Sequence, residues 1–93
     1  MLPEKRTTTH AGEILGKEFL EPAGITQTGL ARHLGVPVQR VNELVRGKRG
    51  ITPDTAWLLG EALGTGPEFW MNLQVAFDLT SIEPPRRVKR LVA

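Results

Sequence analysis

The chain has no cysteine among its 93 residues, which excludes disulfide bonds, thiolate metal sites and a cysteine nucleophile. It also lacks any apolar run approaching the roughly 18 residues that are needed to span a bilayer. Residues 1–6 contain no apolar signal core, so we expect a cytoplasmic protein. Hydrophobic residues make up 40% of the chain and charged residues 24%, which is typical of a folded, soluble domain.

Groups that could perform catalysis are scarce. His10 and His33 are the only histidines, and without cysteines or paired carboxylates they predict no metal site. Residues 64–66 (Gly-Thr-Gly) lack the lysine and the flanking strand of a phosphate-binding loop. Ser81 has no evident base or oxyanion partner. We therefore expect no enzymatic activity and no cofactor. A small hydrolase or nuclease is the remaining catalytic alternative, and these absences count against it.

Charge is distributed unevenly along the chain, although the formal net charge is only +2. Residues 32–49 are strongly basic and contain Glu43 as their only acid. Residues 50–85 contain no Lys or Arg, and residues 86–90 are basic again. Because a local field of one sign attracts a ligand of the other, this segregation indicates an anionic partner for the basic segment. The alternative is that these runs are only solvated surface.

The pattern of apolar residues, caps and breakers predicts an all-α fold with five helices. Thr26 and Thr52-Pro53 are typical helix starts, and Gly35, Gly47 and Gly64 are typical helix ends. The predicted helices lie at about 10–20, 26–34, 37–46, 52–64 and 67–79, with the first one stopped by Pro22 and Gly24. The length allows one domain, so we divide the chain into an N-terminal arm (1–9), a helical domain (10–80) and a basic tail (81–93).

Residues 26–48 have the spacing of a helix-turn-helix, with two short helices joined through Gly35. If Val41, Leu44 and Val45 point inward, the polar side chains of their helix face solvent and suit the edges of bases in a major groove. The candidates for base contacts are Val38, Gln39, Arg40, Asn42 and Glu43. Those for phosphate contacts are Gln27, Arg46, Lys48 and Arg49. Glu43 would repel phosphate unless it accepts from a cytosine or pairs with Arg40 or Arg46. An ordinary helical hairpin with a polar face is the alternative.

The last predicted helix has more apolar surface than one small core requires. Phe69, Trp70, Leu73 and Phe77 share one face, while Met71, Val75 and Leu79 lie elsewhere around the helix. A second apolar surface indicates a contact between subunits. The predicted dimerisation residues are Trp70, Met71, Leu73, Val75, Phe77 and Leu79. Alternatively, all of them pack into the core of a monomer.

The stretch from Thr26 to Lys48 resembles the helix-turn-helix of the lambda repressor and Cro superfamily. Residues 10–15, 19–22, 46–56 and 67–74 are similar, in the same order, to those of HigA antitoxins and their VapI relatives. The resemblance covers residues 10–80 and implies a five-helix, lambda-repressor-like, DNA-binding fold. It also implies a dimer that binds operator DNA, represses its own toxin–antitoxin operon and neutralises a RelE-like mRNA endonuclease. The alternative is a stand-alone helix-turn-helix regulator that has no toxin.

Overall fold

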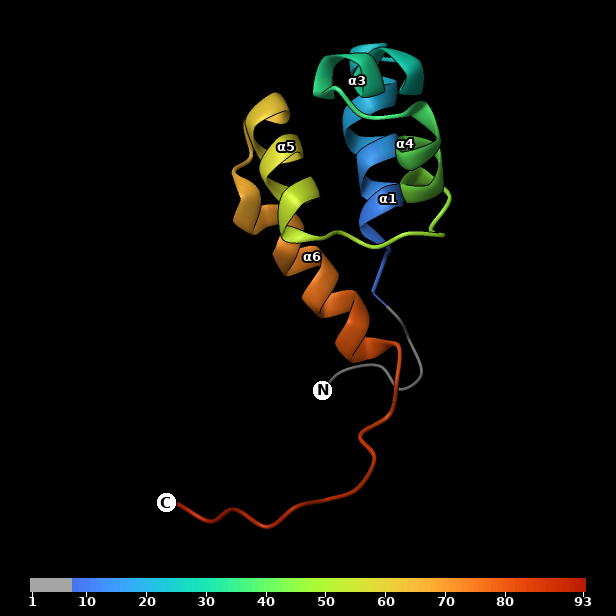
Figure 1. Cartoon of the computed structure of the whole chain (residues 1–93). Helices are drawn as coiled ribbons and strands as arrows, with labels where there is room; N and C mark the ends of the chain where they lie inside the picture. The colour runs from blue at the N-terminus through green and yellow to red at the C-terminus, as the bar shows by residue number, and fades with distance from the viewer. Residues whose placement is uncertain (1–7) are drawn as a thin grey trace.

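The computed structural model describes residues 8–93, and all regular secondary structure within that range is helical (Figure 1). A first rod consists of α1 (Ala11–Ile14), the π-helical η1 (Leu15–Leu20) and α2 (Glu21–Ala23). It is followed by α3 (Gln27–Leu34), α4 (Val38–Val45), α5 (Pro53–Leu63) and α6 (Pro67–Thr80). Counting the rod as one helix, the described residues confirm the predicted five-helix, all-α fold. Residues 1–7 of the predicted arm lie outside the described range.

The first rod ends later than the sequence predicts. His10 starts it, because its Nδ1 accepts the backbone N–H of Gly12 at 2.8 Å. The backbone stays helical through Pro22 and ends at Gly24, which has a φ of 67°. The predicted stop at Gly24 is therefore confirmed, but the prediction that the helix ends at Leu20, before Pro22, is wrong. A proline ring clashes with the carbonyl four residues earlier in a regular α-helix, and the wider π turn that precedes Pro22 leaves room for the ring.

The predicted caps of the later helices are present. The Thr26 Oγ1 accepts the backbone N–H of Gly29 at 2.9 Å at the start of α3. Gly35 ends this helix in the left-handed region, with a φ of 75°, and a residue with a side chain would be strained there. Thr52 caps α5, and Pro53 occupies its first turn, where no N–H donor is required. Each cap satisfies backbone groups that would otherwise lack partners.

Every helix except the short α2 contributes to one hydrophobic core. The buried apolar side chains are Ala11, Leu15, Leu20, Leu30, Ala31, Val41, Leu44, Ile51, Ala56, Leu59 and Trp70. Trp70 is 0% exposed, and its ring lies 5.3 Å from that of Phe19 and 5.0 Å from that of Phe69. Burial of an aromatic side chain of this size contributes a large share of the stability of a small domain.

The helices α5 and α6 pack against each other, and both lie beside the first rod (Figure 1). The backbone N–H of Thr8 donates to the Thr80 Oγ1 at 3.0 Å, which ties the start of the described chain to the end of α6. Residues 81–93 then run as an extended segment away from the helical domain. None of the helices in residues 8–93 is long and apolar enough to cross a membrane.

Candidate nucleic-acid interface

The two helices α3 and α4 form the predicted helix-turn-helix. Val41 and Leu44 are buried against Leu30 and Ala31, as expected from their spacing. Val45 is half-buried and packs at the edge of the same core. Because these apolar residues fix the rotation of α4, its remaining side chains face away from the core. The outer surface of α4 is thus set by packing on its inner surface.

A side-chain hydrogen bond joins α3 to α4 outside the core. The Asn42 Nδ2 donates to the Gln27 Oε1 at 3.2 Å. Gln27 lies in the first turn of α3, where backbone N–H groups have no partner within the helix. The structure therefore places Gln27, which is predicted to contact a phosphate, beside Asn42, which is predicted to contact a base. The amide of Gln27 is held in place before any ligand arrives.

Glu43 is neutralised within the protein by Arg49. The Arg49 Nε and Nη2 donate to the Glu43 Oε1 at 3.2 and 2.9 Å. The Gln39 Nε2 donates to the other carboxylate oxygen at 3.3 Å. The sequence left open whether Glu43 pairs with Arg40 or Arg46, and the structure pairs it with Arg49 instead. The reason is that the chain turns back after α4, where the Lys48 N–H donates to the Glu43 carbonyl at 2.8 Å and places Arg49 beside this carboxylate.

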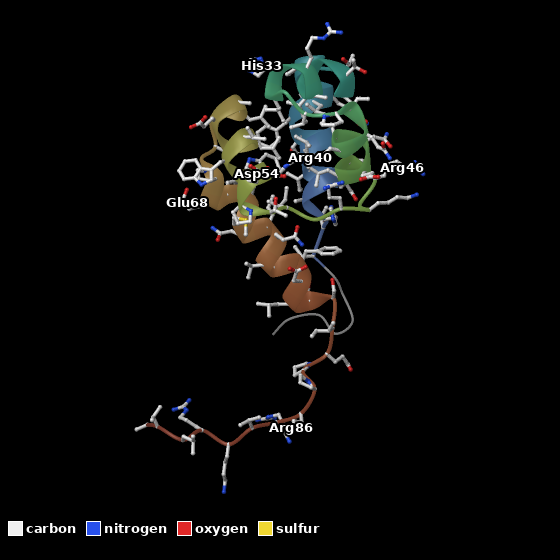
Figure 2. The ribbon with its side chains drawn as sticks, in the orientation of Figure 1. His33, Arg40, Arg46, Asp54, Glu68 and Arg86 are labelled. Carbon is white, nitrogen blue, oxygen red and sulfur yellow. The ribbon has the colours of Figure 1, made fainter. Side chains whose placement is uncertain are left out.

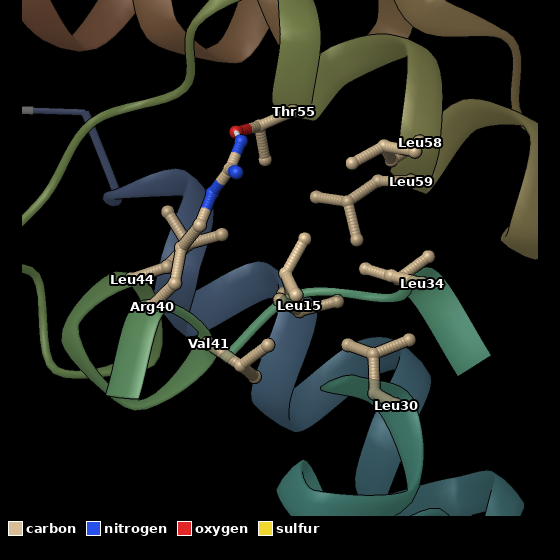
Figure 3. Close-up of a pocket in the computed structure, with 10 residues that line it drawn as sticks. Leu15, Leu30, Leu34, Arg40, Val41, Leu44, Thr55, Leu58 and Leu59 are labelled. Atoms are coloured by element: carbon tan, nitrogen blue, oxygen red, sulfur yellow. Dashed lines mark hydrogen bonds between the residues drawn. The ribbon is translucent and has the colours of Figure 1, made fainter. Parts of the chain in front are cut away.

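Arg40 extends from α4 toward α5 (Figures 2 and 3). Its Nη2 donates to the Asp54 Oδ2 and to the Thr55 Oγ1, both at 2.7 Å. The Arg40 side chain retains 26% of its exposure. Sequence reasoning missed Asp54 and Thr55 as partners, because they are 14 and 15 residues away and no local pattern connects them. In this arrangement the guanidinium links α4 to the start of α5.

The other predicted contacts lie on the outside of the helix-turn-helix. Val38 is 45% exposed at the start of α4, and Gln39 is exposed one residue later. Arg46 and Lys48 are exposed just beyond the end of α4, and Figure 2 shows Arg46 extending outward from the domain. Within residues 8–93, neither of these two cations forms an ion pair. Their charges are therefore free to interact with an external anion.

The structure separates the predicted dimerisation residues into two groups. Trp70 is completely buried in its own chain, so its assignment to a dimer contact is wrong. It lies in the core because its ring packs against the rings of Phe19 and Phe69. Met71 and Leu73 are half-buried against the same core, and Phe77 contacts the ring of His10. Val75 is 50% exposed and Leu79 is 69% exposed. These two are the apolar residues of α6 most available to a partner.

Sequence reasoning also missed Trp57, which is 58% exposed on α5. Asp54 and Glu61 are exposed as well, and both lie one helical turn from Trp57. The apolar spacing of α5 contained the signal, because Ala56 and Leu59 occupy the buried face and leave Trp57 outside it. An exposed tryptophan beside carboxylates is a candidate for contact with another macromolecule.

The cavity enclosed between α4 and α5 is too small for a metabolite, whereas a wider, open pocket of about 450 Å³ lies between α3 and the end of α5. The enclosed cavity has a volume of about 10 Å³ and is lined almost entirely by aliphatic side chains such as Leu15 and Leu59 (Figure 3). This volume holds one water molecule at most. Among residues 8–93, no three His, Asp or Glu side chains are grouped closely enough to bind a metal ion. The chemistry that the described site offers is hydrogen bonding and positive charge.

A helix-turn-helix family model matches residues 17–70. Virulence-associated protein I of Dichelobacter nodosus is 44% identical over 78 residues, which is 84% of this chain and 72% of that protein. The chain belongs to the helix-turn-helix family. A solved structure of Pseudomonas aeruginosa antitoxin HigA with the higBA promoter matches with 44% identity and a TM-score of 0.78, over 80% of each chain. Antitoxin GraA in complex with its operator matches with 41% identity and a TM-score of 0.84, over 100% of both chains.

The matched residues of this helix-turn-helix protein include all the candidate DNA contacts. The family model spans α3, α4 and α5 and ends at Trp70. The predicted similarity to HigA antitoxins and VapI is confirmed, because both names recur among its relatives. Residues 81–93 lie beyond the family model, but the alignment to GraA in complex with its operator includes them.

Proposed function

We propose that this chain is a DNA-binding antitoxin of the HigA type, which represses its own operon as a dimer and neutralises a RelE-like toxin. The observation that carries the proposal is the outward polar surface of α4, where Gln39, Glu43 and Arg49 are already joined by hydrogen bonds. The full-length similarity to GraA, which was solved with its operator, supports it. Operator DNA is therefore the partner to which the geometry points.

The proposed contacts with base edges come from the outer surface of α4. Gln39 and Asn42 can make paired hydrogen bonds with adenine, and Val38 can contact the methyl group of a thymine. The carboxylate of Glu43 can accept from the amino group of a cytosine, and its pairing with Arg49 lowers its repulsion of nearby phosphates. Arg40 would have to leave Asp54 before it could contact a base.

The proposed phosphate contacts surround this surface. Gln27 offers its side chain together with the free N–H groups of the first turn of α3. Arg46, Lys48 and Arg49 supply positive charge beyond the end of α4. Of the three, Arg49 is already paired with Glu43 and contributes less net charge. We expect Arg46 and Lys48 to provide most of the electrostatic attraction to DNA.

The proposed dimer contact is centred on Val75 and Leu79, with Met71, Leu73 and Phe77 beside them on α6. One helix-turn-helix recognises a single half-site, so two copies are needed to bind a palindromic operator tightly. Removal of exposed apolar surface from water supplies the driving force for association. Residues 50–85 contain no Lys or Arg, which suits a face that is kept away from DNA.

Two measurements test this function. Competition titration of the protein with the DNA upstream of its own reading frame and with scrambled DNA should give a preference of roughly 10³-fold or more. Co-expression of this chain should restore the growth of cells that produce a small basic protein encoded next to its reading frame. Sequence-specific binding without such a neighbour or such rescue would favour the stand-alone regulator. Equal affinity for both DNAs would contradict specific DNA binding altogether.

A further inference from the structure

The basic tail, residues 81–93, contacts little of its own chain. Every residue in it is exposed, and Figure 2 shows Arg86 far from the helical domain. Its apolar side chains are unusually accessible: Ile82 is 67% exposed, Val88 77%, Leu91 99% and Val92 75%. Four positive charges lie among them, on Arg86, Arg87, Lys89 and Arg90. The tail therefore presents both cationic and apolar groups that its own domain leaves exposed.

A surface of complementary character lies on α5 and α6. We call it the acidic face and define it by Asp54, Trp57 and Glu61 on α5 and by Glu68, Val75 and Leu79 on α6, all of which are exposed. Asp54 is paired with Arg40, but within residues 8–93 neither Glu61 nor Glu68 forms an ion pair. The acidic face thus combines negative charge with exposed apolar side chains. The basic tail combines positive charge with exposed apolar side chains.

The tail of one chain does not lie on its own acidic face. It leaves α6 after Thr80 and runs away from α5, which gives the molecule a long axis of 49 Å against 25 and 21 Å in the other two directions (Figure 1). The alignment to GraA in complex with its operator covers 100% of both chains and so includes the tail, whereas the alignment to HigA with its promoter covers 80%. A related chain is therefore matched along this extended segment as well.

We propose that the basic tail of one protomer binds the acidic face of a second copy of this chain. The inference rests on the dimer of the proposed function and adds an exchange of tails to it. A guanidinium of Arg86 or Arg87 can lie over the ring of Trp57 as a cation–π contact, with Glu61 and Glu68 as counter-ions. Val88 and Leu91 can cover Val75 and Leu79. DNA would satisfy the cations but would leave the apolar side chains of the tail exposed, so a second copy of the chain fits better.

Photo-crosslinking tests where the tail lies. Benzoylphenylalanine is incorporated in place of Leu91 in the full-length chain, and equal amounts of ¹⁴N and ¹⁵N protein are mixed with and without operator DNA. We expect crosslinked peptides that join the tail of one isotopic copy to residues 53–80 of the other. Crosslinks within a single copy, crosslinks to DNA alone, or no crosslinks would overturn the proposal.

Charge reversal tests the electrostatic part. The double substitution Arg86→Glu/Arg87→Glu should raise the Kd of the dimer roughly tenfold, because the tail would then place negative charges opposite the carboxylates of Glu61 and Glu68. Adding Glu61→Arg/Glu68→Arg should restore the Kd to near its original value. The control is Lys17→Glu, which reverses an exposed charge on the first rod and should leave the Kd unchanged. An unchanged Kd for the tail variant, or a failure of the compensating pair to restore it, would contradict the exchange.

The same samples separate this inference from the proposed function. If sedimentation shows a monomer at every concentration, both the dimer and the exchange of tails are wrong. If the chain is a dimer that binds the operator but forms no tail crosslinks between copies, only the exchange is wrong. Crosslinks to residues 53–80 of the second copy, together with restoration by the compensating pair, would support both.

Discussion

At the residue scale, Glu43 shows how the structure accommodates an acid on the proposed DNA-binding surface. An unpaired carboxylate would repel phosphates, but the fork of Arg49 binds one of its oxygens through two N–H groups. The other oxygen accepts from Gln39 and so limits the rotation of that side chain. A side chain that is already oriented loses less entropy on binding. The acid thus contributes to the order of the surface around it.

Gln39 and Arg40 are adjacent in sequence, and we expect different effects from changing them. Gln39→Ala should lower the preference for operator over scrambled DNA by about 1–3 kcal/mol, because a base contact is lost. Arg40→Ala should reduce that preference less and lower stability by about 1 kcal/mol, because it breaks the partly exposed link to Asp54. Competition titration and thermal denaturation measure the two effects. If Arg40→Ala changed the preference as much as Gln39→Ala does, Arg40 would be a base contact.

Arg46 and Lys48 are expected to act through charge alone. Replacing each by Ala should weaken binding to all sequences and reduce the slope of log affinity against log salt by roughly 0.9 for each contact that is lost. Binding titrations at several salt concentrations give the slope. The comparison is Arg49→Ala, which should change the slope less, because Arg49 is paired with Glu43. Slopes equal to that of the original protein would place Arg46 and Lys48 away from DNA.

At the scale of the helical elements, close approach of the first rod to α4 positions the proposed DNA-binding surface. A Cβ atom added at Gly12 would lie 1.7 Å from the Leu44 carbonyl oxygen, which belongs to backbone that cannot move independently. At Gly16, one turn later, it would lie 3.4 Å from a Val45 methyl group, at ordinary contact distance. The two glycines therefore make very different demands on packing, although they lie on the same rod.

This difference predicts unequal effects of the same substitution. Gly12→Ala should destabilise the fold by about 1–3 kcal/mol or more, because the rod must move away from α4. Gly16→Ala should be close to neutral, since a small packing strain is offset by a better helix former. Chemical denaturation of both variants measures the free energy of unfolding. Similar values for the two would mean that the contact between the rod and Leu44 is not tight in solution.

At the scale of the whole molecule, the exposed apolar residues of α6 are expected to determine the oligomeric state. Val75→Glu/Leu79→Glu should give a folded monomer with much weaker operator binding, because charges at a contact that excludes water oppose association. Sedimentation reports mass, circular dichroism reports the fold and titration reports DNA affinity. Val75→Ser/Leu79→Ser serves as a control that removes apolar area without adding charge, and it should weaken the dimer less. A variant that stays dimeric would place the contact elsewhere.

Trp70 should behave in the opposite way. Its ring is enclosed within the chain, so Trp70→Ala should lower the free energy of unfolding by about 3–5 kcal/mol. Where the variant is folded, for example at low temperature, it should still be a dimer. Denaturation and sedimentation distinguish the two properties. If the variant were folded and nearly as stable as the original protein but monomeric, Trp70 would belong to the dimer contact.

The helices and their limits were largely predictable because their signals are local. Thr26 can cap only the N–H groups of its own helix, and Gly35 permits the left-handed turn at its own position. The rotation of α4 was predictable for the same reason, since the spacing of Val41 and Leu44 defines its buried side. The exception was Pro22, where the π turn that allows the rod to continue has no simple signature in the sequence.

By itself, the sequence determined the number of helices, the helix-turn-helix and the segregation of charge. Tertiary structure alone decided that Arg40 binds Asp54 and that Glu43 binds Arg49. Helix formation depends on residues a few positions apart, so periodicity reveals it. The partner of a long charged side chain depends on how separate helices and loops are placed, and several partners were equally compatible with the sequence until packing fixed those positions.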